Sequence, residues 1–323
     1  MQGRDFSKLV EDLNLDEELI NRIKKIDKLT DLLNLFSTAT AIKEKHFTNK
    51  IEFCAIVNAK SGLCPEDCAF CAQSSVSKAK MPIYPLMEPE EILNRALIAK
   101  KGKARRFSIV TSGRGSFTKR QKMKILKAVE LIREKAEILP DASLGVIDED
   151  FLKDLKNAGL SRYHNNLETS ASYYPRIVTT HKQEDKIRVL EKAKEIGLEI
   201  CSGGIFGLGE SFEQRIEMAH QLKKLDVDSI PINFLHPIPG TPLENAHYLT
   251  PLDALKSVAV YRLIFPDKHI LIAGGREYLM GDLQSYLILA GVSGLMVGNY
   301  LTTKGRNFED DIKMVTKLGL EIL

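Results

Sequence analysis

Three cysteines, Cys64, Cys68 and Cys71, stand within eight residues of this 323-residue chain. Their spacing, C-x₃-C-x₂-C, places three thiolates on one short loop. Such thiolates can each bind one iron of a cubane iron–sulfur cluster, which leaves the fourth iron without a protein ligand. That fourth iron can then bind a small molecule. The spacing therefore predicts a 4Fe–4S cluster with one open coordination position.

Structural zinc and unligated loop thiols are the simpler interpretations of the same cysteines. A structural zinc site almost always takes four ligands, usually as two spaced pairs. Here the nearest histidine is His46, and Cys54 falls inside an apolar run that is typical of a strand. The missing fourth ligand disfavours zinc, and a non-catalytic zinc-binding protein stays open as an alternative function.

The composition is that of an ordinary globular protein. Hydrophobic residues make up 44% of the chain and charged residues 28%, and 46 Lys and Arg against 43 Asp and Glu give a net charge of +3. This balance argues against a nucleic-acid binder and a membrane-surface protein. The charged start at Met1 to Phe6 is unlike a signal peptide, and no apolar run approaches the ~18 residues of a membrane span. Clustered cysteines in odd number are typical of the reducing cytoplasm, where we expect the chain.

Eight short apolar runs alternate with amphipathic helical segments after residue 50. The runs are Ile51–Val57, Phe107–Val110, Ala142–Val146, Arg162–Leu167, Glu199–Gly203, Ser229–Phe234, Ile270–Ala273 and Leu295–Val297. The helical segments include Glu90–Lys101, Lys119–Glu137, Glu184–Ile196, Phe212–Leu225 and Leu252–Ile264. Such alternation implies parallel strands with crossover helices. Eight units over about 270 residues match a (β/α)₈ TIM-type barrel better than a doubly wound sheet, since no G-x-G-x-x-G turn follows the first run.

Residues 1–50 are expected to form a helical extension. Leucine and isoleucine recur there at helical spacing, at Leu9, Leu13, Leu19, Ile20, Leu29, Leu32, Leu33 and Leu35. No Gly- or Ser-rich linker divides the remainder, so we expect residues 51–323 to form a single barrel domain.

Residues suited to chemistry follow the predicted strands. Because the carboxyl ends of barrel strands meet at one mouth, where barrel enzymes have their active sites, we expect these residues to gather there. They are the cysteine loop, Thr111–Arg114, Asn166–Glu168, Cys201–Gly204, Asn233, Gly274–Arg276 and Gly298–Tyr300. This placement predicts an enzyme without reference to any motif.

Several longer blocks accompany the cysteine spacing. They are Asn58–Ser74, Arg106–Arg114, His164–Ser170, Cys201–Glu210, Pro231–Leu235, Pro239–Leu243, Ala273–Glu277 and Leu301–Thr303. Together they resemble the biotin synthase family of radical S-adenosylmethionine enzymes, over nearly everything from Ile51 to Thr303. The three cysteines alone specify only the superfamily, whereas the other blocks are more particular.

The resemblance implies a reaction and its cofactors. Cys64, Cys68 and Cys71 would hold a 4Fe–4S cluster whose open iron binds S-adenosylmethionine. One electron from a small redox protein, of the flavodoxin or ferredoxin type, would cleave the sulfonium to a 5′-deoxyadenosyl radical. That radical would abstract hydrogen from dethiobiotin, into which sulfur is inserted to give biotin, while the protein positions the reactants and excludes water. The resemblance also implies a homodimer.

The same resemblance implies roles for other residues. The S-adenosylmethionine site would include Phe70, Asn166, Glu168, Lys186, Gly203 and Gly204, and the dethiobiotin site would include Asn233, Thr302 and Thr303. We expect Asn233, Thr302 and Thr303 to border one cavity with Glu168 and the cysteine loop at the mouth. These residue types also have simpler structural roles, because glycine makes tight turns and Asn, Glu and Thr cap turns. Lys186 stands where the family often has Arg, so the charge is kept but bidentate geometry is lost.

The chain departs from the family at a second cluster. The best-known members hold a 2Fe–2S cluster inside the barrel with three cysteines and one arginine, and this cluster is thought to supply the sulfur. Here only Cys201 matches, and the other positions fall at Ser108, Asp141 and Leu271. Serine and aspartate oxygens are poorer ligands for a sulfide cluster than thiolates, and leucine is none. We therefore expect no four-ligand 2Fe–2S cluster, and a related radical enzyme, a lipoyl-type sulfur inserter or a hydrogenase-maturase-like lyase, stays open as an alternative.

Cys54 adds one more thiol to the predicted barrel interior. Its simplest role is that of a small buried hydrophobe; the alternative is that Cys54 and Cys201 together bind a different auxiliary cluster. Alternate strand residues face opposite sides, and we expect five residues to face inward: Cys54, Ser108, Asp141, Cys201 and Leu271. A buried Asp141 should then have a partner such as Arg106.

Overall fold

The computed structural model describes residues 17–323 and is built around a closed barrel of parallel strands. The strands are β1 (Lys50–Lys60), β2 (Arg106–Thr111), β3 (Leu139–Ser143), β4 (Arg162–His164), β5 (Glu199–Cys201), β6 (Gly204–Phe206), β7 (Ser229–Phe234), β8 (His269–Ile272) and β9 (Gly294–Met296). The ring closes where β9 pairs with β1 and Met296 lies opposite Cys54. Because β5 and β6 both pair with β7 and share one position, the ring has the eight positions of the predicted (β/α)₈ barrel. The predicted fold class is confirmed.

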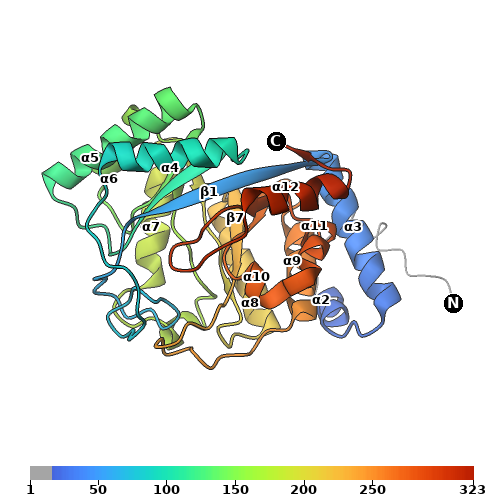
Figure 1. Ribbon diagram of the computed structural model, residues 1–323. Coiled ribbons are helices and arrows are strands. Elements are labelled where there is room, and N and C mark those ends of the chain that lie inside the picture. Colours follow the sequence, from blue (N-terminus) through green and yellow to red (C-terminus); the bar gives the residue numbers. More distant parts are fainter. Residues whose placement is uncertain (1–16) are drawn as a thin grey trace.

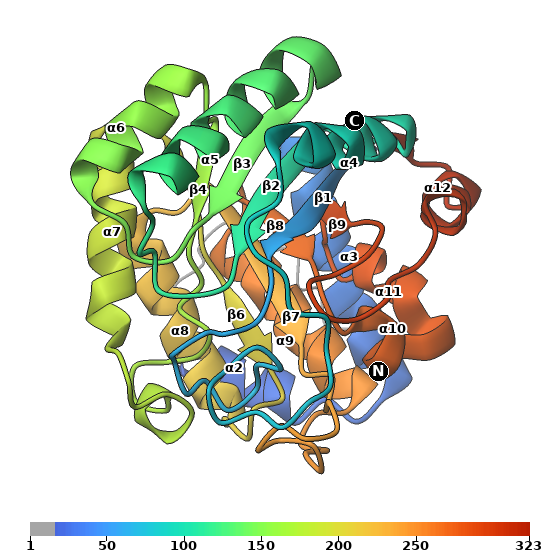
Figure 2. The same cartoon turned by 60° about the vertical axis from the view of Figure 1, so that its left-hand side comes forward.

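Helices surround the strands on the outside (Figure 2). They are α4 (Pro89–Lys101), α5 (Lys119–Leu131), α6 (Glu149–Ala158), α7 (Gln183–Glu195), α8 (Phe212–Leu225), α9 (Pro251–Ile264), α10 (Arg276–Met280), α11 (Gln284–Leu289) and α12 (Phe308–Lys317). Five of them begin after a residue whose side chain accepts a hydrogen bond from the first turn, namely Thr118, Asp148, Ser211, Thr250 and Asn307. These caps end loops that leave the carboxyl ends of strands, so the helices start at the mouth.

Some predicted boundaries are wrong by a few residues. The third strand, predicted as Ala142–Val146, is Leu139–Ser143, because buried apolar residues such as Leu144 continue beyond the paired segment. The predicted helix Lys119–Glu137 is α-helical in its first part only, and it continues as a π-helical turn over Ile132–Ala136.

The predicted fifth strand, Glu199–Gly203, ends two residues early, and a separate strand follows it at the mouth. β5 ends at Cys201 and β6 begins at Gly204. The chain that leaves β4 lies alongside this break, since the N–H of Glu168 donates to the carbonyl of Gly203 (3.2 Å) and the N–H of Ile205 donates to the carbonyl of Glu168 (2.7 Å). The break therefore arises from pairing with another part of the chain.

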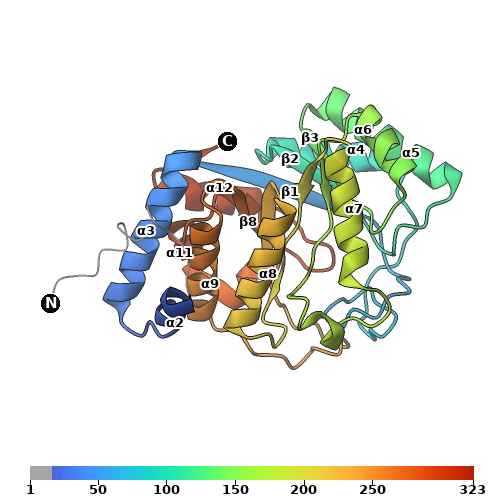
Figure 3. The ribbon, with the colours of Figure 1, turned by 180° about the vertical axis from the view of Figure 1, so that it is seen from behind.

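From residue 17 onward, two helices precede the barrel. They are α2 (Glu17–Lys24) and α3 (Leu29–Phe47), which pack against α9 and α11 on the outside of the barrel (Figure 3). The described part of the predicted extension is thus helical, whereas the division into an extension of residues 1–50 and one domain of residues 51–323 stays a prediction.

The leucines that predicted these helices differ in burial. Leu19, Leu32 and Leu35 are buried, while Leu29 and Leu33 are 68% and 48% exposed. The remaining two, Leu9 and Leu13, lie outside the described residues. Only part of the leucine pattern therefore marks a packed face.

The carboxyl end of the chain returns to the start of the barrel. A short strand, β10 (Glu321–Ile322), pairs with Lys50 and Ile51 of β1, at the end opposite the mouth (Figure 1). Within residues 17–323, no helix has both the length and the apolar character needed to cross a bilayer.

Candidate active site

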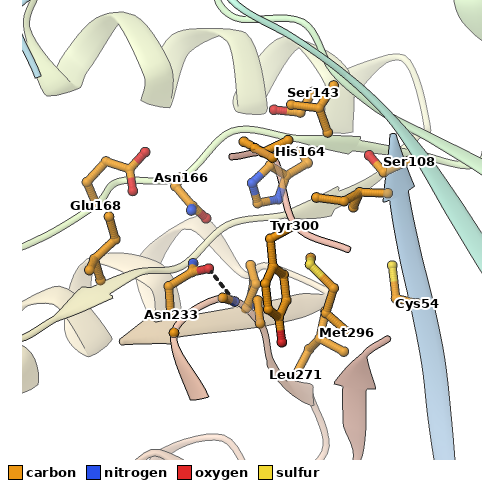
Figure 4. Close-up of a pocket in the computed structure, with 18 of the residues that line it drawn as sticks. Cys54, Ser108, Ser143, His164, Asn166, Glu168, Asn233, Leu271, Met296 and Tyr300 are labelled. Atoms are coloured by element: carbon orange, nitrogen blue, oxygen red, sulfur yellow. Dashed lines mark hydrogen bonds between the residues drawn. The ribbon is translucent and has the colours of Figure 1, made fainter. Parts of the chain in front are cut away.

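A cavity of about 310 Å³ opens inside the barrel, and residues of all eight strand positions line it (Figure 4). Phe70 of the cysteine loop lines it together with Glu168, Asn233, Thr302 and Thr303. The prediction that the cysteine loop and these polar residues border one cavity is therefore confirmed. The cavity connects the inner edge of the cysteine loop to the barrel interior.

The five residues predicted to face inward all line this cavity. Cys54, Ser108, Asp141, Cys201 and Leu271 reach it from β1, β2, β3, β5 and β8. Figure 4 shows Cys54, Ser108 and Leu271 along its wall. Their inward orientation is confirmed.

A network of charged side chains, here called the ionic floor, closes the cavity toward the amino ends of the strands. Arg106 Nη1 donates to Asp141 (3.0 Å), its Nη2 donates to Glu199 (2.7 Å), and its Nε lies 3.5 Å from Glu52. Arg162 Nε donates to the same carboxylate of Glu199 at 2.9 Å. The predicted pairing of Asp141 with Arg106 is confirmed. Burial raises the pKa of Asp141 to about 6, and the two guanidinium groups limit the rise.

The two thiols of the interior are buried. Cys54 and Cys201 are each 6% exposed. Burial raises the pKa of both thiols, that of Cys201 to about 11, and the carboxylate of Asp141 raises both further. Ionising Cys201 also disfavours ionising Cys54, which shows that the thiols lie within electrostatic reach of each other. Both are therefore neutral thiols at pH 7 in the protein alone.

Backbone hydrogen bonds fold the cysteine loop at the mouth. The N–H of Cys71 donates to the carbonyl of Cys68 (3.1 Å), and the N–H of Cys64 donates to the carbonyl of Gln73 (3.3 Å). These bonds turn the chain back on itself, so that the three thiols belong to one compact loop.

Two acidic residues anchor the cysteine loop to the segment that precedes α7. The carboxylate of Asp67 accepts from the N–H groups of Thr179 (2.9 Å) and Thr180 (3.1 Å), and Glu66 Oε2 lies 2.6 Å from His181 Nδ1. Burial disfavours the charged form of Asp67, but the hydrogen bonds from Thr179 and Thr180 outweigh it and lower its pKa to about 2. The acidic residues between the cysteines therefore position the loop.

The cysteine loop suits a cluster better than a single metal ion. Cys64, Cys68 and Cys71 are partly exposed, and burial raises the pKa of Cys68 and, to about 11, that of Cys71. Within residues 17–323 no three His, Cys, Asp or Glu side chains converge on one metal position, as structural zinc requires. A cubane instead takes each thiolate at a different iron, so three separate thiols fit it.

Glu168, Lys186 and Asn166 form a polar group between the cysteine loop and the cavity. Lys186 Nζ donates to the carbonyl of Asn166 (3.0 Å) and lies 3.5 Å from Glu168 Oε1. Glu168 has φ 71°, a left-handed conformation that is uncommon for a non-glycine residue and gathers at functional sites. Its other oxygen, Oε2, is buried without a hydrogen-bond partner among the described residues. Such an oxygen is suited to accept from a hydroxyl of a bound molecule.

Gly203 and Gly204 are required by the backbone around them. A Cβ atom on Gly203 would lie 1.9 Å from the carbonyl oxygen of Pro231, and one on Gly204 would lie 2.4 Å from that of Glu168. Asn166 Oδ1 also accepts from the N–H of Gly203 (3.1 Å). Close packing of strands explains both glycines, and their approach to a cofactor stays a prediction.

Asn233 is held in the cavity wall by the backbone on both sides. Its Oδ1 accepts from the N–H of Gly274 (2.9 Å; Figure 4), and its Nδ2 donates to the carbonyl of Gly204 (3.2 Å). An amide has two N–H groups and two lone pairs, so one of each remains for a ligand.

Sequence reasoning missed two cavity residues on β4, Arg162 and His164. The imidazole of His164 forms no hydrogen bond with the rest of residues 17–323. Burial lowers its pKa to about 4, so it is neutral at pH 7. Strand alternation was the available signal, because Arg162 and His164 stand four and two residues before Asn166, at alternate positions that face the same side.

Two family models match the chain in succession. The Radical SAM superfamily model matches residues 60–222, and the Biotin and Thiamin Synthesis associated domain model matches residues 231–321. The first match begins at the cysteine loop, and the second runs from β7 to β10.

Relatives match almost the whole chain. The biotin synthase of Thermodesulfovibrio yellowstonii is 52% identical over 90% of this chain and 91% of its own length. That of Citrifermentans bemidjiense is 49% identical over 90% of this chain and 89% of its own. That of Geobacter sulfurreducens is 46% identical over 98% of this chain and 96% of its own.

Solved structures share the fold at much lower identity. Methylornithine synthase superposes with a TM-score of 0.85 at 19% identity, over 98% of this chain and 96% of that one. A maturase of the FeFe-hydrogenase superposes with a TM-score of 0.81 at 16% identity, over 100% of this chain and 76% of that one. These likenesses show the fold alone. The identity to the three relatives goes further: the chain belongs to the biotin synthase family of the radical S-adenosylmethionine superfamily.

Proposed function

We propose that this enzyme inserts sulfur into dethiobiotin to give biotin, in a radical reaction that S-adenosylmethionine initiates. The observation that carries the proposal is the single cavity bordered by Phe70 of the cysteine loop, Glu168, Asn233 and Thr302. A substrate bound there lies within reach of the loop at which the radical is generated. Membership in the biotin synthase family supports the choice of substrate.

The cysteine loop and the polar group beside it supply the cofactor site. Cys64, Cys68 and Cys71 would hold three irons of a 4Fe–4S cluster, which together with S-adenosylmethionine supplies a radical able to remove hydrogen from unactivated carbon. Glu168 offers its unpartnered Oε2 to a hydroxyl of the nucleoside. Burial raises the pKa of Glu168, and Lys186 beside it limits that rise.

Phe70, Gly203 and Gly204 would shape the same site. Phe70 lines the cavity with an aromatic ring suited to contact with a base. Gly203 and Gly204 would let the backbone beside Glu168 and Pro231 pack closely next to the site. Asn166 holds this backbone in place through its bond to Gly203 at 3.1 Å.

Substrate recognition would use two separate polar positions. Asn233 has one N–H and one lone pair left for the ureido group of dethiobiotin. Thr302 and Thr303, in the loop after β9, offer hydroxyls to the carboxylate at the rim of the cavity. Two anchors at the two ends of the substrate would fix which carbons face the cysteine loop.

A four-ligand 2Fe–2S cluster of the family's usual kind does not fit this interior. Asp141 is paired with Arg106 at 3.0 Å, and Leu271 has no donor atom. Sulfur transfer through such a cluster therefore lacks a ligand set in this interior. That a different second cluster needs Cys54 and Cys201 stays a prediction. Iron and sulfide counts with Mössbauer spectra on the Cys54→Ala/Cys201→Ala variant test it, and a full 2Fe–2S signal in that variant would contradict it.

Anaerobic reconstitution tests the function directly. The enzyme, loaded with iron and sulfide, is mixed with S-adenosylmethionine, dethiobiotin and dithionite, and biotin and 5′-deoxyadenosine are measured by mass spectrometry. We expect both products from the wild type and neither from Cys68→Ala. Cleavage of S-adenosylmethionine without biotin would point to a related radical enzyme with another substrate. We further propose a homodimer in the cytoplasm, as in the family, and light scattering tests the dimer.

A further inference from the structure

The proposed reaction needs one electron from outside for each S-adenosylmethionine cleaved, and this inference rests on that proposed function. We propose that the outer surface of the cysteine loop is the docking surface of an acidic one-electron carrier protein. We call this surface the donor face. Its apolar centre consists of Leu63 and Ile83, to which we assign the exposed Val76 of the segment between them. We assign its basic rim to Lys60, which precedes the loop, and to the exposed Lys78 and Lys80 of the same segment.

Leu63 is the most unusual residue of the donor face. Its side chain is 83% exposed, and its φ of 50° lies in the left-handed region, which a bulky residue rarely adopts. Hydrogen bonds on both sides hold it there, since Gly62 N donates to Gln73 Oε1 (2.9 Å) and Cys64 N to Gln73 O (3.3 Å). The loop thus keeps a large apolar side chain in solvent directly beside a predicted cluster ligand. A strained backbone at an exposed apolar residue such as Leu63 favours a role in binding a partner, because the side chain does not pack in the core.

Ile83 continues the apolar centre from a second segment. Ser61 and Tyr84 exchange backbone hydrogen bonds of 3.1 and 3.2 Å, which bring residues 82–84 beside the start of the cysteine loop. A Cβ atom on Gly62 would lie 2.8 Å from Ile83 Cγ1, so Ile83 packs on the residue next to Leu63. Ile83 is itself 61% exposed.

The basic rim carries charges that are free to meet a partner. Lys60, Lys78 and Lys80 form no ion pair with any of residues 17–323. The two acidic residues of the loop, Glu66 and Asp67, are turned away toward His181 and the two threonines before it. The carboxylates of Glu66 and Asp67 therefore do not offset the positive charge of the donor face.

The segment next to the donor face adds to its positive field. Residues 92–129 contain twelve Lys and Arg and no Asp or Glu, although the whole chain has a net charge of only +3. This segment reaches the donor face at Phe117, whose ring centroid lies 6.0 Å from Lys60 Nζ. In Figure 1 the loop between β1 and α4 lies on the same side of the molecule as α4 and α5.

Charge and position together define the partner. Opposite charges raise the association rate of two proteins, and this effect weakens as salt rises. A small apolar centre inside a charged rim is typical of a transient interface. A carrier seated here lies against the cysteine loop without entering the cavity. Each turnover then oxidises the carrier by one electron and reduces the sulfonium of S-adenosylmethionine by one.

The test compares two charge reversals of equal size. Lys78→Glu/Lys80→Glu changes the donor face, and the control Lys223→Glu/Lys224→Glu changes two exposed residues in the last turn of α8, outside the basic segment. Binding of an oxidised acidic flavodoxin is measured by calorimetry. Cleavage of S-adenosylmethionine is measured with reduced flavodoxin and, separately, with dithionite.

We expect Lys78→Glu/Lys80→Glu to weaken flavodoxin binding and to slow flavodoxin-driven cleavage at least tenfold at low salt. Its dithionite-driven rate should equal that of the wild type, and the control pair should behave as wild type throughout. Equal losses in both pairs, or flavodoxin binding that is unchanged in Lys78→Glu/Lys80→Glu, would overturn the proposal. Absence of biotin with dithionite would overturn the proposed function instead, and the binding measurement would still decide the docking surface.

Discussion

Burial in the cavity wall keeps the imidazole of His164 neutral at pH 7. It stands opposite Cys201 in the register of β4 and β5 and lines the cavity. Burial lowers its pKa to about 4, and the positive charges of Lys186 and Arg162 act in the same direction. A neutral imidazole offers a bound molecule one donor and one acceptor. At pH 7 His164 therefore adds no charge to the cavity wall between the thiols of Cys54 and Cys201 and the mouth.

We expect acid to destabilise the folded enzyme through His164. The ordinary pKa of histidine is 6.5, and in the folded protein it is about 4. Between these values the unfolded chain binds a proton that the folded chain does not, so stability falls as pH falls through this window. His164→Asn should reduce the loss between pH 7 and pH 5 by on the order of 1 kcal/mol. Urea unfolding at both pH values measures this.

Exposed His46 provides the control for this experiment. His46→Asn should leave the loss between pH 7 and pH 5 as it is in the wild type. If His164→Asn loses as much stability as His46→Asn, the imidazole of His164 is not buried in its neutral form.

At the scale of elements, the local pattern predicted what local forces decide. Apolar runs and amphipathic segments come from neighbouring residues, so the alternation of strands and helices was predictable, and with it the mouth where Asn166 and Asn233 lie. The break between β5 and β6 was not predictable, because Glu168, in the segment after β4, pairs with the backbone there. The same holds for the ionic floor, whose pairs join residues such as Arg106 and Glu199 that stand 93 positions apart.

Gly203→Ala should disrupt the junction of β5 and β6. The added Cβ would lie 1.9 Å from the carbonyl oxygen of Pro231, so the strands must separate. We expect a loss of about 1–3 kcal/mol in the free energy of unfolding, measured in urea. Ser202→Ala is the matched control, because the Ser202 hydroxyl is buried without a hydrogen-bond partner among residues 17–323 and its loss should cost little. Similar stability of the two variants would show that this contact relaxes easily.

At the scale of the whole molecule, the two matched family models share one barrel. The models end and begin at residues 222 and 231, yet β6 and β7 pair across that boundary. A buried ion pair further joins α10 to α12, where Arg276 Nη2 donates to Asp311 at 2.6 Å and neither side chain is exposed. The carboxyl-terminal helix is thereby fixed to the element that follows β8.

Asp311→Ala should destabilise the whole barrel. It leaves Arg276 buried without its carboxylate partner, which costs about 3–5 kcal/mol when a buried pair loses one member. The double variant Arg276→Met/Asp311→Leu removes both charges and should recover much of the loss. Thermal unfolding of the three proteins measures this, and equal melting temperatures for wild type and Asp311→Ala would refute the role of the pair.

The ionic floor also determines the order of events in the cavity. Below it, Glu52 lines a separate depression at the opposite end of the barrel, together with His269. The floor separates the cavity from that depression, so we expect reactants to enter on the side of Phe70 and the loop of Thr302. When two reactants enter a cavity from the same side, the one that binds deeper must bind first and its product must leave last. We therefore expect ordered binding, in which the outer reactant blocks dissociation of the inner one.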